Sequence, residues 1–206
     1  MPALAIGVFT DRVLATVDDR FDADALVADL VAIDFEAKAG SIAVLPGRGG
    51  WDRVYAVGLG EEVTTEGLRQ AAGSLGRVAK GEVVSLLGLV DVEEAERAAA
   101  EGFVLGAYRF SRYKSSDQPP PPSLVNWSGD PITEAVTWTR DLVNEPAVDQ
   151  MPAEIADRVV AIGAELGFEV GVLGIDELRE GGFGGILGVN AGSVHEARLL
   201  DIRYRP

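Results

Sequence analysis

His195, the single histidine of the chain, is the first residue whose side chain suggests chemistry. The pair His195-Glu196 matches the first two positions of the zinc-protease motif H-E-x-x-H. That motif needs a second histidine as a metal ligand one helical turn later, and this position holds Leu199. We therefore interpret His195 as a solvated loop residue and predict no metal site around it.

Two serines lie near glycines, as does the nucleophile in the elbow motif G-x-S-x-G. In that motif, glycines on both sides of the serine allow a sharp strand-to-helix turn. Ser193 lacks both flanking glycines, and Ser74 lacks the first of them and lies inside a predicted helix. We predict that neither serine is a nucleophile.

Glycine clusters raise the question of a phosphate-binding loop. Gly58-Leu59-Gly60 follows a predicted strand and precedes a predicted helix, as in a dinucleotide-binding loop, but the third glycine of that pattern is replaced by Val63. A tight strand exit is our interpretation. The glycines at 184–192 are not followed by lysine, which excludes a P-loop.

Acidic pairs occur at the ends of predicted elements, where carboxylates gain from the dipole of a helix N-terminus without any metal. They are Asp18-Asp19, Glu61-Glu62 and Glu93-Glu94. Asp149 and Asp176 fit ordinary turn and cap positions. The sequence thus predicts no catalytic, cofactor-binding or metal-ligating residue in this chain.

The composition of the chain argues against nucleic-acid and membrane partners. The net charge is −15, and a surface this acidic repels phosphate backbones, so no nucleic-acid partner is expected. The chain has no cysteine, no apolar run long enough to span a bilayer, and no basic signal-peptide start, so we expect a cytoplasmic protein without a membrane partner. Its arginine-rich, alanine-rich and glycine-rich usage is typical of a GC-rich bacterial genome.

The first half of the chain alternates strands and helices, which favours an α/β layered fold with a largely parallel sheet. Apolar runs predict strands at 4–10, 41–45, 53–59 and 83–90, with 13–17 a further strand that pairs with the first. Apolar residues at helical spacing predict helices at 22–33, 64–80 and 92–111. The inner face of the last helix is mostly alanine and glycine, which we expect to let it lie close to a sheet.

A run with four consecutive prolines, at 115–131, predicts an extended linker between a first domain at 1–114 and a second at 132–206. In the second domain, Ala135, Trp138 and Leu142 predict a helix that ends before Pro146, and a second helix covers 152–166. A strand at 168–173, a short helix at 175–180, a glycine turn at 181–185 and strands at 186–189 and 199–204 follow.

Short motifs in this order resemble the leucyl (cytosol) aminopeptidase family. They are DFEAKAG at 34–40, VGLG at 57–60, YRFSRYK at 108–114, RDLVNEP at 140–146, and Gly184-Gly185, Val189, Gly192-Ser193, Arg198 and 204–206 after them. The resemblance implies a macro-domain-like α/β/α N-terminal domain, followed by the first helices and strands of the α/β catalytic domain. Met151, Val148 and Ala197 depart from the family pattern, and Met151 removes the side-chain half of a helix capping box.

The resemblance implies a metallopeptidase that releases N-terminal residues from peptides with two divalent metal ions, manganese or zinc, in a homo-oligomer that is a hexamer in the family. The family's metal ligands lie in motifs resembling G-K-G-x-x-F-D-x-G-G and N-T-D-A-E-G-R, which are absent from these 206 residues. The chain by itself is therefore expected to be inactive and to bind no catalytic metal.

A second hypothesis is a non-enzymatic module with a macro-like fold that binds a nucleotide such as ADP-ribose or a partner protein. A third is that the catalytic part is a separate or missing polypeptide. Titration calorimetry with ADP-ribose separates the first two hypotheses, and the coding sequence beyond residue 206 tests the third.

Overall fold

A computed structural model describes residues 1–205 except positions 17, 21 and 116–117. The end of the strand predicted at 13–17, part of the predicted linker and the last residue of the motif at 204–206 lie outside the described residues. The chain divides into two compact units, residues 1–140 and 141–206.

The first unit is built on a five-stranded sheet with the order β2-β3-β1-β4-β5. Its strands are β1 (Ala3–Phe9), β2 (Ile42–Pro46), β3 (Arg53–Gly60), β4 (Glu82–Ser85) and β5 (Ser123–Leu124). All neighbouring strands run parallel except β2, which runs antiparallel to β3. The predicted α/β fold with a largely parallel sheet is confirmed.

Two apolar cores lie on opposite faces of this sheet. Along β1, Ala3 and Ala5 belong to one core and Leu4, Ile6 and Val8 to the other. This alternation follows from the pleat of a strand, which points successive side chains to opposite faces. A central strand buried on both faces therefore reads as a continuous apolar run.

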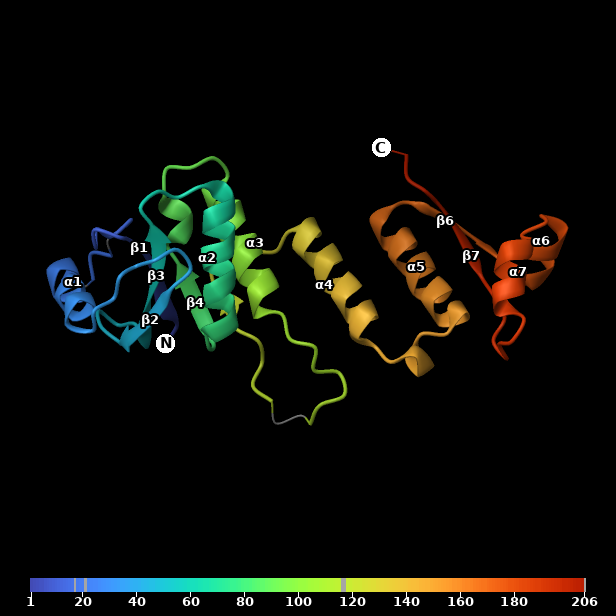
Figure 1. Ribbon diagram of the computed structural model, residues 1–206, viewed down its shortest axis with the longest axis horizontal. Coiled ribbons are helices and arrows are strands. Elements are labelled where there is room, and N and C mark those ends of the chain that lie inside the picture. The colour runs from blue at the N-terminus through green and yellow to red at the C-terminus, as the bar shows by residue number, and fades with distance from the viewer. Residues whose placement is uncertain (17, 21, 116–117, 206) are drawn as a thin grey trace. The chain divides into compact units, whose positions relative to one another are not determined.

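Helices cover both faces of the sheet (Figure 1). Helix α1 (Ala23–Ala32) buries Leu26 and Leu30 in the core on one face. Helices α2 (Thr65–Val78) and α3 (Ala95–Ala107) cover the other face. Thr64 caps α2, because its Oγ1 accepts a 3.0 Å hydrogen bond from the Gly67 amide. The sandwich has the three layers that the sequence predicted.

Helices α2 and α3 lie in backbone contact. A Cβ placed on Gly102 would lie 2.0 Å from the Arg69 carbonyl oxygen, and one on Gly106 would lie 2.1 Å from that of Gly73. The expectation that all the small residues of this helix face a sheet was wrong for these two glycines. Ala99 and Phe103 take the sheet-facing positions instead.

Strand β4 and helix α3 are shorter than predicted. β4 ends at Ser85, because residues Leu87–Leu89 form a 3-10 helix in place of the second half of the strand predicted at 83–90. The predicted helix at 92–111 corresponds to α3 at Ala95–Ala107.

Part of the proline-rich run belongs to the sheet. Ser123 and Leu124 form β5, which pairs in parallel with Glu82 and Val83 of β4. The prediction of a spacer without packed structure was wrong at these two residues. The proline run itself lacks amide donors, but the residues after it have them and complete the edge of the sheet.

The second unit contains most of the later elements, and helix α4 (Pro131–Asn144) crosses the division between the units. The unit holds a 3-10 turn at Ala147–Asp149, α5 (Pro152–Leu166), β6 (Glu169–Leu173), α6 (Ile175–Glu180), α7 (Gly184–Asn190) and β7 (Leu199–Arg203). β6 and β7 form an antiparallel pair, and α5 packs on β6. The predicted start of a second α/β domain is confirmed.

Two local predictions in this unit need correction. Residues 186–189 were predicted as a strand and belong to helix α7, which lies against α6. At the start of α5, the Glu154 carboxylate accepts a 3.0 Å hydrogen bond from the Met151 amide. The half of the capping box that depends on the N-cap side chain is lost, and the half that depends on Glu154 is retained.

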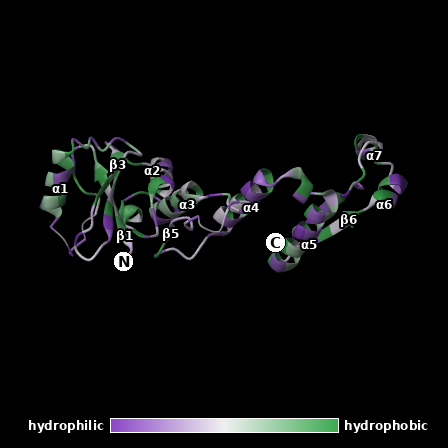
Figure 2. Ribbon diagram, turned by 90° about the horizontal axis from the view of Figure 1, so that it is seen from below, coloured by the Kyte–Doolittle hydropathy of each residue, from purple (hydrophilic) through white to green (hydrophobic). Residues whose placement is uncertain are grey.

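The hydropathy of the chain follows this architecture (Figure 2). Strands β1 and β3 are largely hydrophobic, and the helices of the first unit carry both hydrophobic and hydrophilic residues. Among the described residues, no helix combines the length and the apolar character that a bilayer crossing requires.

Candidate functional site

His195 lies in the segment between α7 and β7, where the chain has no helix. The residue is exposed, and its backbone amide donates a 3.0 Å hydrogen bond to Ser193 Oγ. Leu199, at the position of the second histidine in H-E-x-x-H, begins β7. The zinc-protease motif requires a helix that brings both histidines to one face, and this segment does not provide one.

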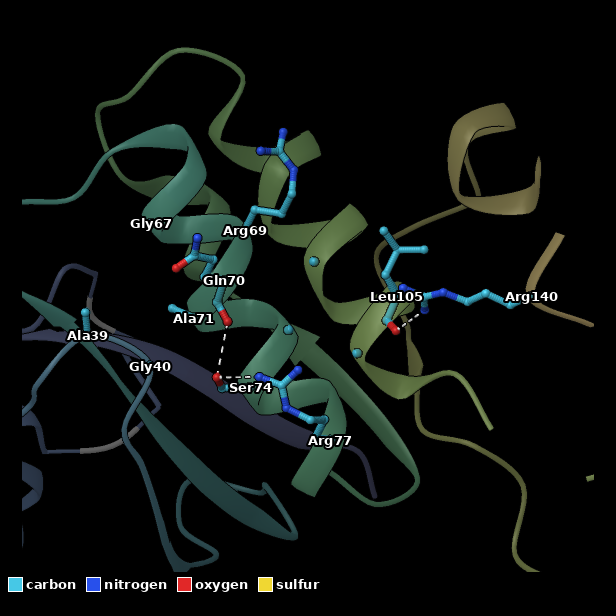
Figure 3. Close-up of a pocket in the computed structure, with 13 residues that line it drawn as sticks. Ala39, Gly40, Gly67, Arg69, Gln70, Ala71, Ser74, Arg77, Leu105 and Arg140 are labelled. Atoms are coloured by element: carbon cyan, nitrogen blue, oxygen red, sulfur yellow. Dashed lines mark hydrogen bonds between the residues drawn. The ribbon is translucent and has the colours of Figure 1, made fainter. Parts of the chain in front are cut away.

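Ser74 lies on α2, and its hydroxyl is bonded within its own helix (Figure 3). Its Oγ donates a 3.2 Å hydrogen bond to the Gln70 carbonyl and accepts a 3.1 Å hydrogen bond from Arg77. Within the described residues no base contacts this hydroxyl. Activation of a serine as a nucleophile requires such a base, and the hydrogen bonds of this hydroxyl are instead made within its own helix.

Gly58 and Gly60 pack against their own chain. A Cβ on Gly58 would lie 2.2 Å from the Lys38 carbonyl oxygen, and the Gly60 amide donates a 3.1 Å hydrogen bond to the Ala37 carbonyl. Gly60 also has φ +81°, which favours glycine. These contacts account for both glycines by the strand exit alone, and they use a backbone donor that a phosphate loop would offer to its ligand.

Several acidic residues that the sequence pairs or places at turns bond to arginine side chains or lie next to a helix. Asp18 is buried and bonded to Arg20, at distances of 2.6 and 2.9 Å, and Glu94 precedes α3. Asp176 pairs with Arg179 of α6. The part of the chain that the structure describes contains no group of three or more histidine, cysteine, aspartate or glutamate side chains that could hold a metal ion.

A pocket of about 470 Å³ lies along the contact of α2 and α3, and we call it the α2–α3 pocket (Figure 3). Gly73, Gly102 and Gly106 line it on the two helices, and Arg69, Arg77 and Arg140 line it as well. Close backbone packing of two helices requires such small residues, and these glycines lie both at the helix contact and along the pocket.

Arg69 is neutralised where it lies. It bonds Glu66 of α2 and Glu101 of α3, the latter at 3.0 Å. These hydrogen bonds, first to Glu66 and then to Glu101, raise the pKa of Arg69. Bonds from Gln70 and then Arg69 lower the pKa of Glu66. The charged groups at this end of the α2–α3 pocket therefore bind one another and link the two helices.

At the C-terminal ends of α2 and α3, two arginine side chains donate hydrogen bonds to backbone carbonyls. Arg109 follows α3 and donates hydrogen bonds to three backbone carbonyls, those of Arg77 at 2.8 Å, Tyr108 at 2.9 Å and Gly106 at 3.1 Å. Arg140 donates a 2.7 Å hydrogen bond to the Leu105 carbonyl of α3. Carbonyls at helix C-termini lack partners in the helix, so basic side chains are favoured there.

The residues of these two helix ends carry no functional motif in the sequence. The available signal was the spacing of Gly73 and Gly76 on one helix and Gly102 and Gly106 on the next, which is the pattern of small residues at a helix contact. Lys80 and Lys114 also stood out only as two of three lysines. Their neighbours in space come from segments far apart in the sequence, so composition could not group them.

Comparisons with known proteins cover nearly the whole chain. The family model for the N-terminal domain of the cytosol aminopeptidase family matches residues 5–117, and that for the catalytic domain of the same family matches residues 137–206. A probable cytosol aminopeptidase of Rhodococcus jostii is 35% identical over 98% of this chain and 43% of its own length. One of Nitratidesulfovibrio vulgaris is 32% identical over 99% of this chain and 48% of its own.

Solved structures agree with this likeness. The bottromycin maturation enzyme BotP in complex with Mn matches with a TM-score of 0.80 and 28% identity, over 99% of this chain and 45% of BotP. A variant of tomato leucine aminopeptidase matches with a TM-score of 0.75 and 22% identity, over 98% of this chain and 47% of that protein, which supports the fold alone. The chain thus spans less than half the length of the relatives that it matches.

Proposed function

The chain belongs to the cytosol aminopeptidase family, and we propose that it is the N-terminal portion of a metal-dependent exopeptidase that releases N-terminal residues from peptides. The observation that carries this proposal is the order of the two family matches, an N-terminal domain at 5–117 and a catalytic domain beginning at 137. We retain 1–114, 115–131 and 132–206 as the proposed domains and linker.

The residues described do not fit a two-metal centre, because no cluster of suitable side chains occurs among them. In our proposal the two divalent ions, manganese or zinc, are held by ligands outside this chain, which by itself has no catalytic or metal-binding residue and is inactive. A manganese complex of a related enzyme supports the choice of metal.

The second unit supports the existence of further catalytic-domain structure. Ala156, Leu178 and Ala197 are its only buried hydrophobic residues among those described. Val172 of β6 and Ile202 of β7 are 40% and 53% exposed. Apolar side chains on the faces of a two-stranded sheet are stabilised only when another layer covers them. We propose that additional strands and helices of the catalytic domain do so.

We further propose that the complete enzyme is cytoplasmic and forms a homo-oligomer, a hexamer as in the family, in which the first unit shapes substrate access and subunit contacts. The relatives' name, cytosol aminopeptidase, supports the location. The acidic charge of −15 supports the absence of a nucleic-acid partner.

The test is hydrolysis of a leucyl chromogenic amide, with and without added manganese or zinc. The product of the whole open reading frame and the 206-residue chain should be compared. We expect metal-dependent turnover from the longer product and none from the 206 residues. A stop codon directly after residue 206, with no ligand motif encoded nearby, would refute the proposal. Turnover by the 206 residues alone would refute the assignment of the site.

A further inference from the structure

We propose that a pocket at the C-terminal end of α2, which we call the α2-end pocket, binds a small anion that carries two or more phosphate groups. The pocket has a volume of about 380 Å³. Four basic residues line it, Arg77, Lys80, Arg109 and Lys114. This proposal concerns the first unit only and does not depend on peptidase activity.

The charge of the α2-end pocket is opposite to that of the chain. None of its described lining residues is acidic, although the chain has a net charge of −15. Two of the chain's three lysines line it. Like charges around one concave surface reinforce one another's potential, so the α2-end pocket attracts anions from solution.

The two arginines are held in place by neutral partners. Arg109 donates to the carbonyls of Arg77, Tyr108 and Gly106, and Arg77 donates to Ser74 Oγ at 3.1 Å. Within the described residues neither forms an ion pair. Their positions are therefore fixed without a carboxylate partner among the described residues, which reduces the entropy lost when an anion binds.

Helix capping explains the position of only some of the four basic residues of the α2-end pocket. Cations near the last carbonyls of α2 and α3 are favoured by the helix dipoles, and this accounts for Arg109. It does not account for Lys80 and Lys114, which come from different segments and have no ion pair among the described residues. Lysine and arginine together are the usual ligands of phosphate oxygens.

The shape of the pocket indicates an organic part on the ligand. Its volume lies within the range of about 300–1,000 Å³ that is typical of small-molecule sites. Pro119–Pro122 and Val78, which is 47% exposed, provide an apolar wall beside the cations. A diphosphate with an attached ring system, as in a nucleoside diphosphate, would place its phosphates on the cations and its ring on this wall.

The proposal is tested by titration calorimetry of the chain with inorganic pyrophosphate and, separately, with ADP. We expect saturable binding of one molecule per chain, with ADP tighter if the apolar wall contributes. Lys80→Gln and Lys114→Gln should each weaken binding about fivefold, the loss expected for one partly exposed charge-assisted hydrogen bond. Lys38→Gln removes the same charge from an exposed ion pair elsewhere and should change affinity less than about twofold.

Three outcomes would overturn the proposal. They are no binding of either anion at millimolar concentration, equal weakening by Lys38→Gln, and equally tight binding of a hexaglutamate peptide or a short DNA duplex. Lys114→Arg keeps the charge and should retain binding, which separates a lost phosphate contact from misfolding. Circular dichroism of each variant checks that the helices are intact.

Discussion

Gly106 of α3 lies against the backbone of Gly73 of α2, so close that a Cβ on Gly106 would be 2.1 Å from the Gly73 carbonyl oxygen. The reciprocal position is looser, because a Cβ on Gly73 would lie 3.3 Å from the Gly102 carbonyl oxygen. A methyl group added at Gly73 on α2 should therefore be tolerated better than one added at Gly106 on α3.

Gly106→Ala should destabilise the first unit by about 1–3 kcal/mol, because the helices must separate to admit the methyl group. Gly73→Ala should cost less than about 1 kcal/mol, since its contact is looser and alanine is the better helix former. Urea unfolding monitored by circular dichroism measures both. Equal effects of the two substitutions would contradict this view of the interface.

Glu101→Gln should destabilise the first unit by about 1–3 kcal/mol. The Glu101 side chain is 10% exposed and bonds Arg69 at 3.0 Å and Arg97 at 2.8 Å. Its neutralisation would remove the carboxylate that the two guanidinium groups share, and Arg97 would keep only the more distant Glu94 at 4.0 Å and Asp130 at 3.8 Å. Glu96→Gln, an exposed change on the same helix, serves as the control and should cost less than about 0.5 kcal/mol in the same unfolding assay.

Stability should fall in acid partly through Asp18. Hydrogen bonds from Arg20 hold the pKa of this buried carboxyl below its usual range, and Arg20 also stacks on Trp51 at 3.9 Å. A lowered folded-state pKa adds stability above the unfolded-state pKa, near pH 4, and this stability is lost as the pH falls through the folded value.

Asp18→Asn should therefore reduce stability at neutral pH and flatten the dependence below about pH 4. Unfolding free energies measured between neutral and acid pH give the slope. Asp19→Asn, at an exposed neighbour, should leave the slope close to that of the unmodified chain. An identical slope for Asp18→Asn would show that this carboxyl does not contribute.

The two units should differ in amide hydrogen exchange. Residues of β1 and β3 are buried on both faces of the sheet, whereas β6 and β7 expose apolar side chains such as Val172 and Ile202. We expect amides of β6 and β7 to exchange at least about a hundredfold faster than those of β1, because opening them exposes little buried surface. Equal protection would contradict the proposal that further structure covers this sheet.

The elements with strong local patterns were predictable from the sequence. The continuous apolar runs of β1 and β3 and the apolar stripe of α2, capped by Thr64, carry their own signals, since burial on two faces or on one stripe dictates residue type. The family was predictable for a different reason: the order of motifs such as RDLVNEP at 140–146 is specific even though each motif is short.

Tertiary structure decided what local patterns left open. The apolar run at 186–189 is too short to distinguish strand from helix, and contact with α6 accompanies the helix. Ser123 and Leu124 became a strand because β4 offered an unpaired edge. Gly102 and Gly106 contact the backbone of helix α2 rather than the sheet. Lys80 and Lys114 are far apart in the sequence, and the fold places both of them in the lining of the α2-end pocket. Sequence fixes the periodicity of each segment, but the partner of each face depends on which segments the fold brings together.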